Sequence, residues 1–272
     1  PESMNHETGY KIMQNRELLK AYNVSDAGAE ATDQEQKLPA APYVKEKKGE
    51  RIISLTTDFD GIAGSTDLFG LLQGRVSRRK YSDEAVTLRE LSFLLWAVQG
   101  IRKVVGRNNF ATFRNVPSAG SRHAFETYLF VNHVDRLEKG IYHYLPMEHA
   151  LEVWDERQDF EGELTQALCG QHFAAAAPVT FVWSAVPYRM EWRYGLKAHK
   201  YILLDAGHVC ENLYLACEAV GCGTCAIGAY DQDALDELLG FAPGPSADTD
   251  YECAVYAASV GKAAAKEYFC AE

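Results

Sequence analysis

The spacing of hydrophobic residues predicts several helices. Residues 10–22 repeat apolar positions with the period of an amphipathic helix. Asp67 can cap a short leucine-containing helix, and Thr87-Leu88-Arg89-Glu90 is a capping box just before apolar residues at helical spacing. We also expect a helix over residues 160–171.

The longest helical candidate covers residues 190–220 and ends at Gly221. Its apolar residues are spread around the helix instead of forming a single stripe. A helix that is apolar on most faces is buried, so we expect this one at the centre of a domain or in a subunit interface. Asp205 and His208 stand one turn apart on it, where they can pair within a satisfied core network.

Short apolar or alternating segments predict a set of β-strands. The turn Pro146-Met147-Glu148 joins two of them as a hairpin, and residues 178–186 are almost wholly apolar, as in a buried strand. Helices and strands are mixed without regular β-α-β alternation, so we predict an α+β fold. The predicted strands are 52–55, 126–132, 140–145, 149–154, 178–186, 223–230 and 252–260.

One long segment lacks any such pattern. Residues 23–50 are polar, contain Pro39 and Pro42, and carry a concentration of charge over residues 45–48. This composition is typical of an extended, linker-like arm with no packed core of its own. We therefore divide the chain into an N-terminal helix and extended arm, residues 1–66, and a main domain, residues 67–272.

Charge and hydropathy exclude several kinds of partner. The chain has 272 residues, with 27 Lys and Arg against 38 Asp and Glu, so its net charge is −11. Such a balance argues against a surface for nucleic acid or anionic membrane. No apolar stretch approaches the ~20 residues that span a bilayer, and the N-terminus lacks the apolar core of a signal sequence. We expect a cytoplasmic protein that contacts neither nucleic acid nor membrane.

The cysteines and the absent motifs narrow the chemistry further. Seven cysteines, an odd number mostly in apolar or small-residue surroundings, indicate reduced core thiols instead of a disulfide framework. Cys222-Gly-Thr-Cys225 is a single C-x-x-C motif without a second ligand pair, so we expect no metal site. The sequence also lacks a G-x-G-x-x-G fingerprint after a strand, a P-loop and the usual hydrolase motifs.

The most distinctive local motif is the basic segment 75–81. In an extended backbone Arg75, Ser77 and Arg79 point to the same side, which suits a phosphate and an adjacent polar ring. The alternative is a solvated basic surface, which is what most basic segments are. No Lys or Arg occurs from Tyr201 to Gly261, where ten acidic residues stand, so the basic groups are concentrated elsewhere.

Two further segments could carry chemistry. Pro117, Ser118, Ala119, Gly120 and Ser121 form a small-residue loop whose backbone a ligand can approach closely, although most such loops are ordinary turns.

Lys200-Tyr201 stands within the long apolar helix. The lysine either extends to solvent beside a core tyrosine or occupies a polar cavity, where burial would lower its pKa and suit it to proton transfer.

Taken together, five segments resemble the nitroreductase superfamily and, within it, the SagB-type dehydrogenase subgroup. They occur in the expected order over residues 75–262, about two-thirds of the chain, and their combination is specific where no single one is. The resemblance implies helices around a central, mostly antiparallel sheet, with a long buried central helix, and a homodimer that binds FMN at the subunit interface. The segments are RVSRRKYSDEAVTLRELSFLLWAVQGI, NVPSAGSRHAFETYLFV, GIYHYLPMEHALEVW, KYILLDAGHVCENLYLACEAVGCGTCAIGAYD and YAASVGK.

The resemblance also implies roles for the basic segment and the small-residue loop. By position, Arg75 and Ser77 would meet the phosphate end of FMN. Arg79 would lie near N1 and the C2 carbonyl of the flavin, where a cation stabilises the anionic reduced form. The loop Pro117–Ser121 would contact the isoalloxazine ring, in this family often from the partner subunit.

Two later segments match the family as well, with departures. Ile227, Gly228 and Ala229 would run their backbone past the N5 side of the ring, and Lys262 would reach the phosphate. Many nitroreductases carry Glu at the position of Gly228, so that side-chain contact is absent here. Ala124 replaces the proline that is usual in the subgroup's loop.

The resemblance implies an FMN-dependent oxidoreductase that moves a hydride through flavin N5, with NAD(P)H as donor and a small acceptor. An alternative within the subgroup is an azoline dehydrogenase, which oxidises peptide thiazolines and oxazolines to azoles with oxygen as acceptor. Those enzymes use a Lys-Tyr pair in the central helix, and Lys200-Tyr201 stands at the matching place. A non-catalytic flavin-binding partner or sensor protein is a third possibility.

Overall fold

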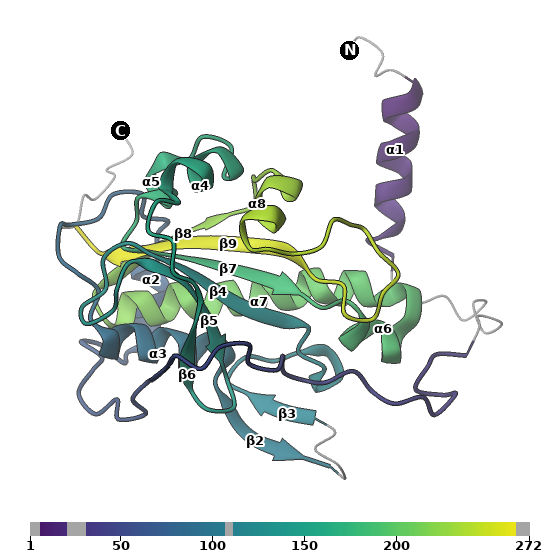
Figure 1. The fold of residues 1–272 in the computed structure, drawn as a ribbon, viewed down its shortest axis with the longest axis horizontal. Helices are drawn as coiled ribbons and strands as arrows, with labels where there is room; N and C mark the ends of the chain where they lie inside the picture. Colours follow the sequence, from purple (N-terminus) through teal and green to yellow (C-terminus); the bar gives the residue numbers. More distant parts are fainter. Residues whose placement is uncertain (1–5, 21–30, 107–110, 265–272) are drawn as a thin grey trace.

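A single antiparallel sheet forms the middle layer of the molecule (Figure 1). The computed structural model describes residues 6–20, 31–106 and 111–264. The seven strands follow the order β1 (Ile52–Ser54), β6 (Ala150–Asp155), β5 (Gly140–Leu145), β4 (Phe125–Val131), β7 (Val179–Ala185), β9 (Cys253–Lys262) and β8 (Cys222–Ile227). All neighbours in this sheet pair antiparallel, and the predicted strands and the β5–β6 hairpin are confirmed.

Helices cover both faces of the sheet, each over its own apolar cluster (Figure 1). One face packs against α3 (Leu88–Gln99) and α7 (Ala198–Ala219), with α2 (Leu68–Gly74) beside α7. The other face packs against α4 (Glu161–Ala167), α5 (His172–Ala175) and α8 (Gln232–Leu238). This arrangement confirms the predicted α+β fold.

Two predicted helix starts are confirmed by their hydrogen bonds. The Thr87 hydroxyl accepts from the Glu90 amide at 3.1 Å, and the Glu90 carboxylate accepts from the Thr87 amide at 2.9 Å, which completes the capping box. The Asp67 carboxylate accepts from the Gly70 amide at 3.0 Å at the start of α2. Each cap satisfies amide groups that a helix end leaves without partners.

The predicted single helix over residues 190–220 is divided in two. α6 (Tyr188–Tyr194) ends at Gly195, whose φ of 52° lies in the left-handed region, and the short 3₁₀ turn η3 (Gly195–Lys197) leads into α7. Glycine adopts this conformation without steric cost, which is why the chain turns there. α7 is buried on its sheet side but exposes Leu203 and Leu204, 58% and 52% accessible, on the opposite side.

Other boundaries also differ from the sequence prediction. The first helix, α1 (His6–Glu17), begins before residue 10 and ends at Glu17, and it projects away from the sheet (Figure 1). Residues 21 and 22 of the predicted helix lie outside the described residues. A two-stranded ladder, β2 (Ile101–Val105) and β3 (Ala111–Arg114), was not predicted, because its strands mix basic and apolar residues without strict alternation.

Four of the six described thiols lie in the core, as the sequence indicates, but Cys169 is exposed and Cys253 is half-buried. Cys210, Cys217, Cys222 and Cys225 are buried free thiols, and burial raises the pKa of each. Thiols with raised pKa values are protonated and unreactive at neutral pH, as expected for core cysteines. Cys270 lies outside the described residues.

A buried charged network ties the N-terminal arm to the sheet. His143, fully buried on β5, places its two ring nitrogens 2.8 Å from the Glu126 carboxylate and 2.6 Å from that of Glu152. The Arg189 guanidinium donates to the other Glu126 oxygen at 2.5 Å. Burial opposes the charged form of His143, but its hydrogen bonds to the two carboxylates outweigh burial and raise its pKa.

The arm binds this network mainly through its backbone. The Lys45 amide donates to Glu126 at 3.0 Å, and the amides of Lys48 and Gly49 donate to Glu152 at 2.8 and 3.0 Å. The Lys45 ammonium pairs with the buried carboxylate of Glu252. The charged segment 45–48 is therefore partly an anchor, which the polar composition of the arm did not predict.

The pKa shifts of His143 and His123 predict that the protein is most stable near pH 6.5. Since the folded-state pKa of His143 is raised, its contribution is complete below about pH 6.5 and is lost as pH rises. Burial lowers the pKa of His123 to about 2, so its contribution is lost as pH falls below about 6.5. We expect the melting temperature to fall on both sides of that pH.

Urea denaturation between about pH 5 and pH 8 separates the two effects. His143→Gln is expected to remove most of the decline above pH 6.5 and to leave the decline below it. His172→Gln, at an exposed histidine beside Glu161, is the matched control and should preserve both slopes. An H143Q variant that loses stability above pH 6.5 as steeply as the parent would contradict this assignment.

Candidate functional site

The basic segment 75–79 lies along the free edge of β8. Ser77 forms a parallel bridge with Thr224, and the Arg78 amide donates to the Thr224 carbonyl at 2.9 Å. This pairing holds the segment extended, which is the condition under which Arg75, Ser77 and Arg79 point to the same side. Arg75, Ser77 and Arg79 therefore lie on one extended segment at the edge of the main sheet.

Tyr214 on α7 connects this segment to the end of β8. Its hydroxyl lies 2.8 Å from the Ser77 hydroxyl and accepts from the Ala226 amide at 2.9 Å. The Arg75 guanidinium lies over the Tyr214 ring, 5.2 Å from its centroid. The sequence analysis missed Tyr214, because nothing local distinguishes it from the other apolar and aromatic residues of the long helix.

Two of the three arginines in the segment have no carboxylate partner among the residues that the structure describes. Arg78 donates to Glu218 of α7 at 3.0 Å, and its side chain packs against Gly223. Arg75 and Arg79, by contrast, form no ion pair with any described carboxylate, and Arg79 lies 6.0 Å from the Phe173 ring centroid. Both guanidiniums therefore have donors available for an anion.

Neighbouring polar groups reinforce this donor set. Burial raises the pKa of Cys225, while the charge of Arg79 and a hydrogen bond with Ser77 act to lower it. The side chains of Cys225, Arg79 and Ser77 therefore lie close together. The Thr224 hydroxyl is buried with no hydrogen-bond partner among the described residues. Buried polar atoms are rarely left unsatisfied, so this orphaned hydroxyl at the Ser77 bridge is consistent with an absent ligand.

The small-residue loop is held against the other half of α7. The Ala119 amide lies 3.3 Å from the Asp205 carboxylate, which also hydrogen-bonds Ser118, and the Ser118 hydroxyl accepts from the His123 amide at 3.0 Å. Burial raises the pKa of Asp205. Asp205 also lies 3.6 Å from His208, so the two side chains do come together, but His208 is exposed and the expected core network is wrong; the contact of Asp205 with the loop was not predicted.

Gly120 has a structural requirement for glycine. Its φ is 56°, and a Cβ there would lie only 2.5 Å from the Tyr194 hydroxyl. Pro117 and Gly120 are exposed, whereas Ser118, Ala119 and Ser121 are half-buried. The loop therefore offers an open backbone surface beside α6, as a close approach to a ligand would require.

The loop and the basic segment are separated along α7. Asp205 and Tyr214 stand nine residues apart on the helix, which corresponds to about 13 Å at 1.5 Å per residue. A ligand with a planar ring at one end and a phosphate at the other could bridge the two regions, and the donors present suit FMN. Arg75 and Ser77 would hold its phosphate end, and Arg79 and the loop would meet its ring.

The Lys200-Tyr201 pair lies near the loop but not in a buried cavity. Lys200 is half-exposed, and its ammonium donates to the Leu19 carbonyl at 2.7 Å. The Tyr201 ring lies 4.8 Å from the Tyr194 ring, which in turn abuts Gly120. Tyr201 is therefore linked to the loop through one aromatic neighbour, while Lys200 faces the N-terminal segment.

The remaining predicted residues lie at the two ends of β8. Ile227 is buried, and Gly228 and Ala229 are exposed just beyond the strand. The Lys262 ammonium pairs with Glu90, so it is directed toward α3 instead of Ser77. Its contact with a phosphate stays a prediction.

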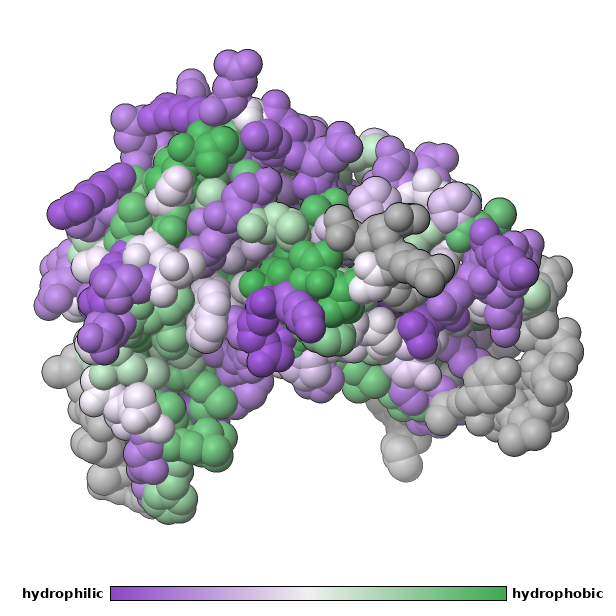
Figure 2. All heavy atoms as spheres, turned by 90° about the horizontal axis from the view of Figure 1, so that it is seen from below, coloured by the Kyte–Doolittle hydropathy of each residue, from purple (hydrophilic) through white to green (hydrophobic). Residues whose placement is uncertain are grey.

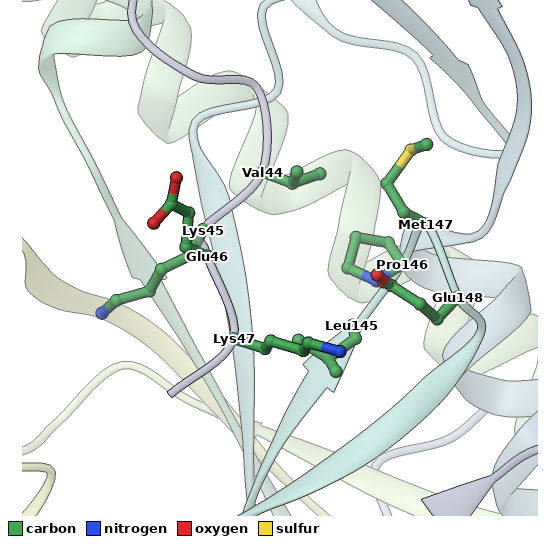
Figure 3. Close-up of a pocket in the computed structure, with 8 residues that line it drawn as sticks. All are labelled: Val44, Lys45, Glu46, Lys47, Leu145, Pro146, Met147 and Glu148. Carbon is green, nitrogen blue, oxygen red and sulfur yellow. The ribbon is translucent and has the colours of Figure 1, made fainter. Parts of the chain in front are cut away.

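The marked hollows of the molecule lie elsewhere. One, of about 410 Å³, separates residues 44–47 of the arm from residues 145–148 of the β5–β6 hairpin (Figure 3). Another, of about 400 Å³, lies beside Lys48 and Trp154. Neither contains a predicted site residue. Seen from below, the molecule has hydrophobic patches within a mostly hydrophilic surface (Figure 2).

Two negative findings concern the part of the chain that the structure describes. No described helix has the length and apolar composition needed to cross a membrane. Within residues 6–20, 31–106 and 111–264, no three His, Cys, Asp or Glu side chains gather closely enough to hold a metal ion.

Known proteins match both the sequence and the fold. A protein of Methanocaldococcus jannaschii with the provisional name nitroreductase MJ1384 is 35% identical over 166 residues, which are 61% of this chain and 80% of that protein. A provisionally named nitroreductase structure from Ralstonia eutropha JMP134 is 26% identical, with a TM-score of 0.62 over 84% of this chain and all of the other.

The fold likeness also extends to the arm. A chain of the Escherichia coli microcin synthetase McbBCD complex, solved with truncated pro-MccB17 bound, matches 96% of this chain and 95% of its own length. At 14% identity and a TM-score of 0.55, this match shows the fold alone.

The matched region contains both parts of the candidate site. The model of the nitroreductase family matches residues 72–262, from the end of α2 to the end of β9. Proteins of this family are oxidoreductases and typically bind flavin. The match covers well over half of the chain and includes the β8 edge, the small-residue loop and α7, so the chain belongs to the nitroreductase family.

Proposed function

We propose that the protein is an FMN-dependent oxidoreductase that reduces a small acceptor with NAD(P)H. The observation that carries the proposal is the donor set at the β8 edge, where Arg75 and Arg79 have no described carboxylate partner and Ser77 is held by Tyr214. Charge-assisted hydrogen bonds from guanidiniums are the strongest that a protein offers a phosphate.

The residues of this chain have distinct tasks in the proposed reaction. Arg75 and Ser77 bind the phosphate end of FMN, and Arg79 places positive charge near the reducible part of the ring. Ala119 and Gly120 present backbone to the ring, with Asp205 fixing the loop on α7. When bound, FMN supplies a hydride-accepting and hydride-donating centre at N5.

We propose that the protein works as a homodimer with FMN at the subunit interface. The exposed Leu203 and Leu204 of α7 and Leu68, Phe69 and Leu72 of α2 support this proposal. α2 contacts α7, so these residues lie on neighbouring helices. Burying them against a second copy would remove apolar surface from water and would enclose an otherwise open site.

An azoline dehydrogenase of the SagB type is the second candidate. Lys200 supports it, because its ammonium donates to a peptide carbonyl, that of Leu19, next to Tyr201. A peptide substrate could replace this carbonyl, with Lys200 and Tyr201 moving the ring proton while oxygen finally accepts the electrons.

Anaerobic mixing distinguishes the two candidates. We expect the FMN-loaded protein to lose its absorbance near 450 nm within seconds of NADH or NADPH addition, because the oxidised flavin is reduced. Lys200→Ala should leave FMN binding and this bleaching within about threefold of the parent. Slow bleaching by both nucleotides, with rapid bleaching by a peptide thiazoline that K200A abolishes, would instead establish the azoline dehydrogenase.

A further inference from the structure

Arg193 and Tyr194 lie directly against the loop proposed to meet the flavin ring. A Cβ built on Gly120 would lie 2.5 Å from the Tyr194 hydroxyl and 3.1 Å from both Cδ and Nε of Arg193. Both residues belong to the last turn of α6, where Gly195 ends the helix. The C-terminus of α6 is thus positioned at the exposed surface of the loop.

The Arg193 guanidinium has no carboxylate partner among the described residues. It is half-buried and lies 5.6 Å from the centroid of the Tyr194 ring. Other arginines of this region are used structurally: Arg189 pairs with Glu126, and Arg122 is fully buried over Trp192. Arg193 is therefore an accessible cation in a chain whose net charge is −11.

The surroundings of Arg193 favour an anion. Burial lowers the pKa of Arg122, and the positive charges of Arg193 and Arg189 lower it further, which shows that these guanidiniums act on one another. An incoming carboxylate or phosphate would relieve this repulsion. Because the site is half-buried, such a contact is screened less than one on an open surface.

Aromatic rings complete the surface. The rings of Tyr194 and Tyr201 have centroids 4.8 Å apart and planes inclined at 58°. This pair offers apolar surface to a planar group whose anionic end reaches Arg193. The same position combines contact with an aromatic ring, a cation and the exposed backbone of Gly120.

We propose that Arg193 and Tyr194 determine substrate specificity by binding an anionic group on a planar, aromatic substrate beside Gly120. This inference rests on the proposed function, since it names the substrate class of the same site. The anionic group has two sources: a carboxylate on the electron acceptor or a phosphate of the nicotinamide nucleotide. Either anionic group would bind the Arg193 guanidinium, and measuring KM for each substrate separates the two sources.

The kinetic test compares matched substrates in Arg193→Gln. With NADH as donor, we expect KM for 4-nitrobenzoate to rise about tenfold, or ~1.4 kcal/mol, while kcat and the KM for neutral nitrobenzene change less than twofold. If the anion is instead the 2′-phosphate that NADPH has and NADH lacks, KM for NADPH rises and KM for NADH does not. Arg193→Lys should recover part of the loss, because it keeps the charge.

A binding experiment is independent of turnover. Calorimetric titration should show that the parent, with or without FMN, binds benzoate or NADP⁺ more tightly than benzyl alcohol or NAD⁺, and that R193Q loses this preference. Arg136→Gln, at an exposed arginine beside Asp135, should retain it. FMN affinity should be equal in all three proteins.

The outcomes separate this inference from the proposed function. Anion preference that depends on Arg193 in a protein that NAD(P)H does not reduce would support the specificity site and reject the proposed electron donor. Equal losses for charged and neutral ligands, or no anion preference in the parent, would overturn the inference even if the flavin is reduced normally.

Discussion

Replacing Glu126 with glutamine is expected to lower the free energy of unfolding by about 3–5 kcal/mol. The Glu126 carboxylate is buried and accepts from His143, from Arg189 and from the Lys45 amide. Burial opposes its ionisation, but Arg189 and His143 outweigh burial and hold the pKa of Glu126 below its usual range. The uncharged amide would keep the shape of the side chain but leave the Arg189 guanidinium buried without its counter-charge.

Urea denaturation followed by circular dichroism at pH 6.5 measures this loss. Glu148→Gln, at an exposed glutamate in the β5–β6 turn, is the matched control and should change the free energy of unfolding by less than 0.5 kcal/mol, about the usual limit for surface substitutions. Because the network also binds the arm, E126Q should make residues 31–50 more sensitive to limited proteolysis. A loss below about 1 kcal/mol would mean that the network contributes little net stability, as is true of some buried ion pairs.

Removing both free guanidiniums of the basic segment is expected to weaken FMN binding about a hundredfold or more. Each charge-assisted hydrogen bond contributes about 1.5–3 kcal/mol, and Arg75→Ala with Arg79→Ala removes two such donors. The effect should be larger at low ionic strength, because the Arg75 contact joins a partly exposed cation to the FMN phosphate. Fluorescence titration of FMN into the apoprotein measures the dissociation constant directly.

Arg78 provides the matched control within the same segment. Its guanidinium is already paired with Glu218, and its side chain packs against Gly223, so Arg78→Ala should change FMN affinity less than fivefold while lowering stability. Riboflavin, which lacks the phosphate, should bind the parent and the single variant Arg75→Ala with similar affinity, whereas Arg79→Ala should weaken it, because Arg79 is proposed to lie near the ring. If R78A loses as much FMN affinity as the double variant, or if R75A weakens riboflavin binding as much as FMN binding, the phosphate assignment is wrong.

Local sequence patterns were sufficient where local hydrogen bonds or burial decide the structure. The capping box at Thr87, the cap at Asp67 and the buried strand over residues 178–186 each depend on groups within a few residues. The break at Gly195 was missed, because apolar residues continue at helical spacing on both sides of it. Only the left-handed backbone at that glycine separates α6 from α7.

For the candidate site, the sequence supplied the donors but not their partners. The sequence singled out Arg75, Ser77 and Arg79 on the condition of an extended backbone, and the bridge of Ser77 to Thr224 meets that condition, but the pairing of Arg78 with Glu218 was not predicted. Tyr214 and Asp205, which hold Ser77 and the small-residue loop, lie on α7 as unremarkable members of a helical pattern. Tyr214 and Asp205 make these contacts because α7 packs beside both the basic segment and the small-residue loop.

The sequence by itself determined the α+β class, most strands and the burial of Cys210, Cys217, Cys222 and Cys225. The tertiary structure alone decided that Ser77 lies beside Tyr214, 137 residues away, that Lys45 pairs with Glu252, 207 residues away, and that Arg193 reaches Gly120. The physical reason is the distance along the chain over which each kind of interaction acts. Helix caps, alternation and hydrophobic periodicity act over a few residues, whereas the order of strands and the packing of α7 depend on burying all apolar faces together.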